Sequence, residues 1–239
     1  MERILDILRR EGPEEKPYRQ CFRYETSDRT ATVATALTAL NDRPDLRDSA
    51  GQPAPPVRWE CSCLQKKCGA CAMVIDGVPR LACDTKLADC GTTIRLEPLK
   101  KFPVIADLMV DRTVMQDNLK ALRLWLADPA VMREQAMDTA YDASRCLQCG
   151  CCLEVCPNFY AGGSFTGMAS AIPFSRLLAE LPASQRKEAS RLYVRRIYEG
   201  CGKSLACRNL CPAGIDVDRL LVNSNAVAVW KRFGTKASR

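Results

Sequence analysis

Fifteen cysteines and no histidine set the chemistry open to this chain of 239 residues. Without histidine, Cys2His2 zinc fingers, Rieske centres, histidine-ligated haem and histidine-based acid–base catalysis within the chain are excluded. The N-terminal segment MERILDILRREG lacks the apolar core of a signal peptide, and no apolar stretch approaches the ~20 residues of a membrane-spanning helix. We therefore expect a reducing compartment, where clustered cysteines indicate metal or redox sites rather than disulfides.

The first cysteine group spells C-x4-C-x2-C-x11-C, and its ligand candidates are Cys63, Cys68, Cys71 and Cys83. This is the plant-type ferredoxin spacing, which predicts a 2Fe–2S cluster held by three thiolates from one loop and a fourth from a nearby strand. A zinc ribbon is the alternative, but zinc sites commonly pair two C-x2-C units, and the four-residue arm does not match that pattern.

Two further groups spell C-x2-C-x2-C-x3-C-P, ending at Pro157, and C-x5-C-x3-C-P, ending at Pro212. In two-cluster bacterial ferredoxins the fourth cysteine of such a run binds the other cluster. This crossing predicts a four-cysteine 4Fe–4S site and a second site with three cysteines. The 4Fe–4S site would use Cys146, Cys149, Cys152 and Cys211, and the three-cysteine site would use Cys156, Cys201 and Cys207.

Ser204 stands in the region where a complete third group would carry another cysteine. Three thiolates predict a 3Fe–4S cluster with one empty corner, and the alternative is a 4Fe–4S centre with Ser204 or water on its fourth iron. Cys21, Cys61, Cys90 and Cys151 remain, and we expect them to be buried and to behave as small hydrophobes. Cys61 and Cys151 adjoin predicted ligands, so either could replace a neighbour.

The formal net charge of +7 would by itself indicate nucleic acid or a membrane surface as a partner. The predicted thiolates and three oxidised cluster cores together carry about −6, which brings the loaded chain close to neutral. We therefore expect the basic excess to compensate the clusters, and we expect no nucleic-acid partner.

A boundary within residues 97–107 separates a mixed part of the chain from a helical part. Before it, strand character marks Tyr18–Glu25, Met73–Ile75 and Thr92–Leu96, a turn signal marks Asp76-Gly77, and Ala31–Leu40 predicts a helix. After it, helices are predicted for the stripe from Met115 to Leu126 stopped by Pro129, from Pro173 through Leu178, from Ala189 to Ile197 ending at Gly200, and from Leu220 to Ala228.

The chain resembles the iron–sulfur subunit of succinate dehydrogenase/fumarate reductase, in the succinate:quinone oxidoreductase family. The matching segments are CLQKKCGACAMVIDGVPRLAC, LEPLKKFPVIADLMVDR, CLQCGCCLEVCPN and CGKSLACRNLCPAGI. The resemblance implies an α+β fold with two domains. A β-grasp plant-type ferredoxin domain with the 2Fe–2S cluster is expected over residues 1–105, followed by an all-α bacterial-ferredoxin-like domain with the 4Fe–4S and 3Fe–4S clusters over residues 106–239.

The resemblance also implies an electron-transfer subunit of an enzyme, not catalytic alone, that passes single electrons between FAD on a flavoprotein subunit and quinone. The other partner of this subunit would be a membrane anchor of cytochrome b type, and the resemblance leaves open whether that anchor contains haem b. The place implied is peripheral, on the cytoplasmic side of the cell membrane. The alternative is a cluster subunit of a soluble fumarate reductase or another oxidoreductase without a quinone-binding anchor.

The chain departs from the family pattern near two predicted clusters. Leu64-Gln65-Lys66 replaces an Arg-Glu-Gly sequence in the first cysteine loop. Asn158 follows Pro157 where ubiquinone-type members carry serine, and Gly202 takes the place of their histidine. These differences favour a menaquinone-type enzyme, with Pro157 and Asn158 in the vicinity of the quinone.

Overall fold

The computed structural model describes residues 1–126, 128–131 and 134–230 of the chain. It divides into two compact units, Met1–Asp111 and Arg112–Arg239. The first unit includes the short strands β6 (Val104–Ala106) and β7 (Met109–Val110), so it ends a few residues beyond the boundary expected from the sequence.

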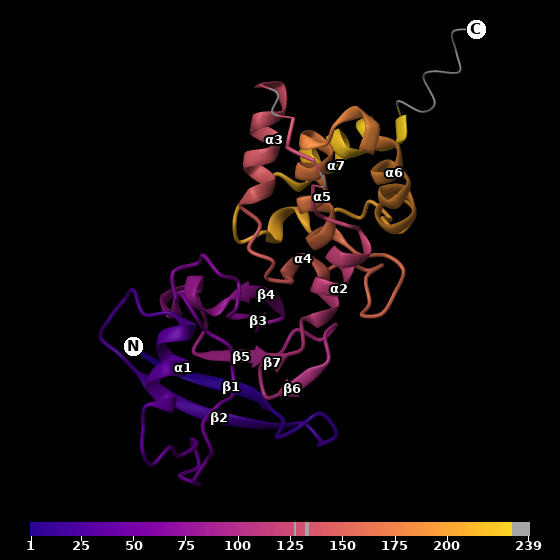
Figure 1. Ribbon diagram of the computed structural model, residues 1–239. Helices are drawn as coiled ribbons and strands as arrows, with labels where there is room; N and C mark the ends of the chain where they lie inside the picture. The colour runs from indigo at the N-terminus through magenta and orange to yellow at the C-terminus, as the bar shows by residue number, and fades with distance from the viewer. Residues whose placement is uncertain (127, 132–133, 231–239) are drawn as a thin grey trace, which may run out of the picture. The chain divides into compact units, whose positions relative to one another are not determined.

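The first unit is built on a five-stranded mixed sheet with the strand order β2-β1-β5-β3-β4 (Figure 1). Strand β1 pairs antiparallel with β2 and parallel with β5, and β3 pairs antiparallel with both β5 and β4. Its elements are β1 (Glu2–Arg9), β2 (Tyr18–Glu25), α1 (Val33–Asn41), β3 (Ala72–Ile75), β4 (Val78–Leu81), the 3-10 turns η1 (Ala82–Asp84) and η2 (Leu87–Asp89), and β5 (Thr93–Glu97). The mixed sheet with its single α-helix confirms the fold expected for this half of the chain.

Helix α1 begins where two threonines cap its first turn. The Thr32 side chain accepts from the Thr35 backbone N–H, and the Thr35 side chain in turn accepts from the Thr32 backbone N–H. This reciprocal pair satisfies two N–H groups that an uncapped helix start leaves without partners. Val33, Leu37 and Leu40 are then fully buried along one side of the helix.

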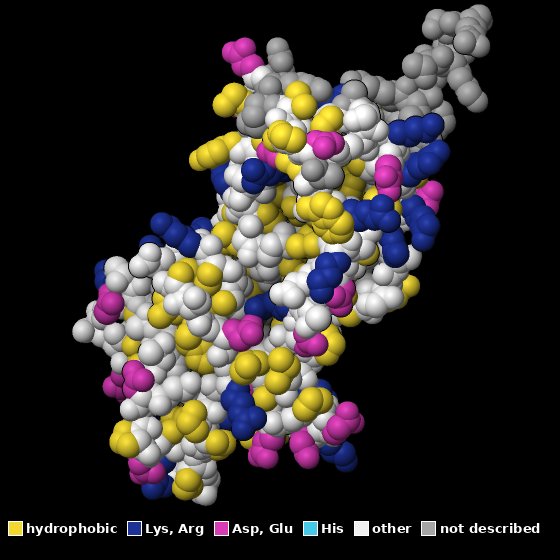
Figure 2. Space-filling view, viewed as in Figure 1, with side chains coloured by type: hydrophobic (Ala, Val, Ile, Leu, Met, Phe, Trp, Pro, Cys, Tyr) yellow, Lys and Arg dark blue, Asp and Glu magenta, His cyan; other side chains and the backbone are white. Residues whose placement is uncertain are grey.

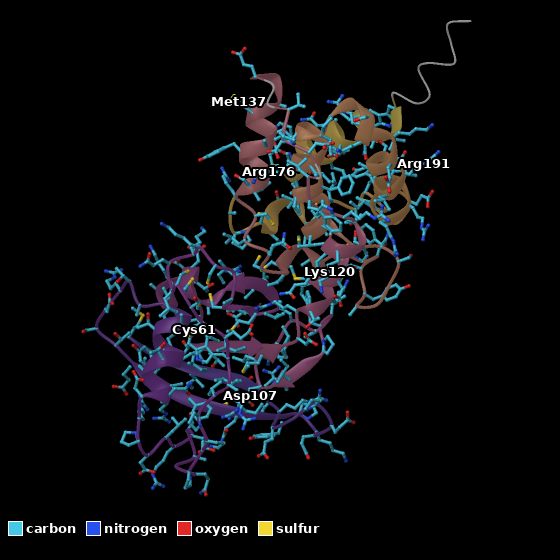
Figure 3. The ribbon with its side chains drawn as sticks, viewed as in Figure 1. Cys61, Asp107, Lys120, Met137, Arg176 and Arg191 are labelled. Atoms are coloured by element: carbon cyan, nitrogen blue, oxygen red, sulfur yellow. The ribbon has the colours of Figure 1, made fainter. Side chains whose placement is uncertain are left out.

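Strand β1 has a charged residue at the end of its buried face. Leu5 and Ile7 point inward, and the alternation of the strand places Arg9 at the next inward position. Arg9 and Asp107, which is labelled in Figure 3, are 2% and 3% exposed and form an ion pair. Two buried charges are stable only when each is paired and hydrogen-bonded. The pair therefore fixes the β6–β7 turn to the end of β1.

The second unit is helical around one apolar core. Its elements are α2 (Thr113–Ala121), α3 (Glu134–Ser144), α4 (Cys151–Glu154), α5 (Met168–Glu180), α6 (Ala183–Tyr193), the π-helical turn η3 (Val194–Tyr198), the 3-10 turn η4 (Arg208–Leu210), α7 (Val217–Asn225) and the π-helical turn η5 (Ala226–Trp230). This confirms a helical second half. No helix among the described residues has both the length and the apolar character needed to cross a membrane.

Two helix boundaries predicted from the sequence are wrong. Helix α2 ends at Ala121 and not near Leu126, because Arg123 adopts a left-handed conformation with φ 51°. Pro173 does not open a helix, since α5 begins five residues earlier in the chain and Pro173 lies inside it. A proline in a helix interior removes one N–H donor and leaves the carbonyl four residues before it without its helical partner.

Candidate iron–sulfur cluster sites

Backbone N–H groups surround the sulfur atoms of the first cysteine loop. The N–H groups of Gln65 and Lys67 both donate to Cys63 Sγ at 3.3 Å, and Lys66 donates to Cys83 Sγ at 3.3 Å. Such bonds stabilise the thiolate form, and the Gln65 and Lys67 N–H groups lower the pKa of Cys63 to about 7. Hydrogen bonds to sulfur are also a main determinant of cluster potential.

Left-handed residues recur two positions apart in all three cysteine loops. The pairs are Leu64 (φ 52°) and Lys66 (φ 59°), Gln148 (φ 49°) and Gly150 (φ 86°), and Lys203 (φ 55°) and Leu205 (φ 55°). A non-glycine residue in this conformation is uncommon and costs about 1–3 kcal/mol, so it persists where the surrounding structure requires it. Turns of this kind aim successive N–H groups at an anion, and a cluster thiolate is an anion.

The four predicted 2Fe–2S ligands lie together in the first unit. Cys63 and Cys68 are linked by a side-chain hydrogen bond, and Cys71 is close to both Cys68 and Cys83. Burial raises the pKa of Cys71 to about 12, so its thiolate needs a positive partner such as iron. The structure therefore brings the four thiols of this group close to one another.

The predicted 4Fe–4S ligands also lie together, in the second unit. Burial, with Cys149 and Cys211 nearby, raises the pKa of Cys146 to about 11. Cys152 is close to the same three cysteines, and burial raises its pKa. A small apolar cavity is lined by Cys146, Cys149, Cys152 and Cys211, and also by Cys207 from the neighbouring set. Two cysteines of the last group, Cys207 and Cys211, thus reach the cavity beside the second group.

The three remaining predicted ligands meet at Cys207. Burial, with Cys156 and Cys201 nearby, raises the pKa of Cys207 to about 11. No three Cys, Asp or Glu side chains within the described part of the chain converge as they would on a single metal ion. Cluster ligands do not require that convergence, since their thiolates bind different iron atoms. The three cysteine sets fit the groups that the sequence predicts.

The four leftover cysteines differ in exposure. Cys151 is fully buried beside Cys149, and a hydrogen bond from its side chain lowers the pKa of Cys149 to about 7. Cys61, labelled in Figure 3, is exposed, so the expectation that it is a buried hydrophobe is wrong. Cys21 and Cys90 are half-buried.

Gln148 is a functional candidate that the sequence reasoning missed. Its side-chain nitrogen donates to Cys146 Sγ at 3.2 Å and to the Ala169 carbonyl at 2.8 Å. Its position between two predicted ligands was the only available signal, because the acceptor on Ala169 lies in a separate helix.

The residues predicted near a quinone form a polar contact of their own. Asn158 Nδ2 donates to the Gly200 carbonyl at 2.8 Å, immediately before Cys201. Pro157 and Asn158 are exposed, whereas Phe159 is 2% exposed and belongs to the core. A side chain on Gly202 would collide with Asn158, since a Cβ there would lie 2.8 Å from Nδ2.

Basic side chains gather on the helical unit around α6 (Figure 2). Lys187, Arg191 and Arg195 are exposed and spaced four residues apart along α6 and η3, and Figure 3 shows Arg191 directed outward. A spacing of four places them on one helix face. The excess positive charge is thus partly local rather than spread evenly around the cysteine loops.

Comparisons with known proteins agree with both halves of the chain. The 2Fe-2S iron-sulfur cluster binding domain model matches residues 4–117, and the 4Fe-4S dicluster domain model matches residues 142–215. The fold of a chain from the Mycobacterium smegmatis Sdh1 complex in the apo form is similar, with a TM-score of 0.74, 20% identity and 97% of each chain covered.

Curated relatives extend the similarity along most of the chain. The succinate dehydrogenase iron-sulfur subunit of Bacillus subtilis (strain 168) is 35% identical over 222 residues, which cover 87% of this chain and 85% of that protein. The fumarate reductase iron-sulfur subunit of Mycobacterium tuberculosis (strain CDC 1551 / Oshkosh) is 30% identical over 230 residues, covering 90% and 89%. The chain therefore belongs to the iron–sulfur subunits of succinate dehydrogenase and fumarate reductase, which are components of oxidoreductase complexes.

Proposed function

We propose that this chain carries single electrons between the FAD of a flavoprotein subunit and a quinone at a membrane anchor of cytochrome b type. The observation that supports this most strongly is the grouping of eleven cysteines into three sets, together with a pair of left-handed residues in each of the three cysteine loops. A protein that only bound a structural metal would need one such set.

The ligand assignment follows the three sets. When bound, the clusters supply centres that each accept and return one electron. Cys63, Cys68, Cys71 and Cys83 would hold the 2Fe–2S cluster, Cys146, Cys149, Cys152 and Cys211 the 4Fe–4S cluster, and Cys156, Cys201 and Cys207 the 3Fe–4S cluster. The chain's own part is to supply thiolates, donate N–H groups to their sulfur atoms and exclude water from the buried ones.

The quinone proposed is menaquinone, with Pro157 and Asn158 in its vicinity. A Cβ on Gly202 would lie 2.8 Å from Asn158 Nδ2, and glycine itself offers no titratable group there. Tyr160 follows Asn158 two residues later in the sequence, and its aromatic side chain is exposed to solvent and to a ligand. These features support a pocket unlike the serine and histidine pocket of ubiquinone-type members.

The location proposed is peripheral, on the cytoplasmic side of the cell membrane and held by the anchor subunit. A soluble fumarate reductase without an anchor is the second candidate, and the two differ in whether quinone is a substrate. The helical unit is compatible with both candidate enzymes, because cysteine loops of the same spacing could hold clusters in either one.

The test is turnover of the purified complex with its own partner subunits under anaerobic conditions. We expect succinate to reduce a menaquinone analogue, or the reduced analogue to drive fumarate reduction, faster than a ubiquinone analogue at equal concentration. Turnover with ubiquinone alone would contradict the quinone assignment. Fumarate reduction by a soluble donor with neither quinone turned over would instead support the anchor-free enzyme.

A further inference from the structure

Helix α5 contains a proline at a position where a helix interior normally excludes it. Residues before and after Pro173 are helical, and the residue four positions earlier is Ala169. In an α-helix the N–H of residue 173 would donate to the carbonyl of residue 169. Proline has no N–H, and its ring also pushes that carbonyl away from the helix axis. The Ala169 carbonyl is therefore available to a donor outside the helix.

The donor that uses this carbonyl is the side chain of Gln148. Its Nε2 lies 2.8 Å from the Ala169 oxygen and 3.2 Å from Cys146 Sγ. Both neighbours accept hydrogen bonds, which fixes the amide with its nitrogen toward them, and each of its two hydrogens serves one neighbour. Ala169 is 2% exposed, so water does not compete for its carbonyl.

The position of Gln148 is costly without these contacts. Its backbone is left-handed, and its Oε1 is buried without a hydrogen-bond partner among the described residues. A buried polar atom without a partner destabilises a fold, so the bonds made by Nε2 must offset that cost. The Ala169 carbonyl supplies the shorter of the two.

We propose that Pro173 is a positioning residue for the tetranuclear centre, which is the 4Fe–4S cluster. It acts through Ala169 and Gln148 on the sulfur of Cys146. This inference rests on the proposed function, because it takes Cys146 as a ligand of that centre. A hydrogen bond to a ligand sulfur favours the more negative, reduced state of a cluster and raises its potential. Pro173 would thus influence the potential without touching the ligand.

The test is a redox titration of the purified complex followed by low-temperature electron paramagnetic resonance (EPR). Pro173→Ala restores an N–H that competes for the Ala169 carbonyl, and Gln148→Leu removes the donor itself. We expect both to shift the tetranuclear midpoint to more negative values. A threefold to tenfold change in the reduction equilibrium corresponds to about 30–60 mV for one electron. The other two centres should keep their midpoints, which also shows that the variants are folded.

The double variant separates this role from a general effect on α5. If Pro173 acts through Gln148, the variant with both substitutions should match Gln148→Leu alone, whereas independent effects would add. Pro182→Ala, at the start of α6, is the matched proline control and should shift nothing. An unchanged midpoint in Pro173→Ala, or additive shifts, would overturn the inference. A wild-type complex without a tetranuclear signal would overturn the proposed function instead.

Discussion

The amide of Asn158 lies so close to the backbone of Gly202 that a side chain on Gly202 would have to displace it. Asn158 Nδ2 donates to the Gly200 carbonyl at 2.8 Å, and a Cβ on Gly202 would lie 2.8 Å from the same nitrogen. The contact joins the turn after Cys156 to the loop that carries Cys201. Two residues that depart from the ubiquinone-type pattern are therefore one structural unit.

Gly202→Ala should disturb the three-cysteine site, because the new methyl group must displace the Asn158 amide. Overpacking of this kind costs about 1–3 kcal/mol. We expect the EPR signal of the trinuclear 3Fe–4S cluster to weaken relative to the signals of the other two clusters. The double variant Asn158→Ala/Gly202→Ala should recover part of that signal. Gly12→Ala is the control, since its Cβ would meet nothing nearer than 4.0 Å. A full-strength signal in Gly202→Ala would mean that the contact does not constrain the site.

Asp107→Asn should destabilise the first unit strongly. The carboxylate accepts from Arg9 and from the backbone N–H groups of Arg10 and Arg58, so its loss leaves a buried guanidinium without its counter-charge. Removing one partner of a buried pair costs about 3–5 kcal/mol. The measurement is the urea midpoint of the full chain by circular dichroism.

The exposed pair between Arg47 and Asp45 provides the comparison for that measurement. Both side chains are more than half exposed, so Asp45→Asn should change the free energy of unfolding by less than about 1 kcal/mol. Equal effects of Asp107→Asn and Asp45→Asn would show that the buried pair does not hold the β6–β7 turn.

Lys66→Gly should lower the potential of the 2Fe–2S centre. Glycine keeps the N–H that donates to Cys83 Sγ and accepts the left-handed backbone, while the ammonium paired with Asp84 at 2.7 Å is lost. A half-exposed charge contributes about 0.5–1 kcal/mol, or about 20–40 mV for one electron. Asp84→Asn should shift the midpoint the opposite way. Shifts of the same sign in both variants would refute a charge effect.

Crossed ligation predicts which signal each cysteine variant loses. Cys211→Ser should remove the tetranuclear signal and Cys207→Ser the trinuclear one, although both lie in the last cysteine group. Low-temperature EPR of the two purified variants shows directly which of the two signals each variant has lost. If each of the last two groups held its own cluster, both variants would lose the same signal.

Local patterns in the sequence predicted several elements of the first unit. Strands were predicted at Tyr18–Glu25 and Met73–Ile75 from strand character and turn signals, and a helix over the alanine-rich Ala31–Leu40, and the structure has β2, β3 and α1 in these places. Strand β1 was not predicted, because its buried face ends in Arg9 and its parallel partner β5 lies far along the chain. Only the tertiary structure shows that Asp107 compensates this arginine.

The second unit shows the same limit in a helix. The apolar stripe that includes Leu122 suggested a longer α2, but the helix ends at Ala121, and Arg123 two residues later is left-handed. Proline is common at helix starts, so Pro173 alone predicted one. The structure places it inside α5, where the side chain of Gln148 bonds to the Ala169 carbonyl. The ligand assignments themselves stay predictions, because proximity of thiols does not identify the cluster that they hold.

The central claim is that three distinct iron–sulfur centres are held by three sets of cysteines. Low-temperature EPR of the anaerobically purified complex, recorded through a redox titration with iron and labile sulfide determined on the same sample, tests it most directly. We predict three centres with separate midpoints, one of them giving an S = 1/2 signal in the oxidised state. A colourless preparation, or iron and sulfide sufficient for only one centre, would contradict the account.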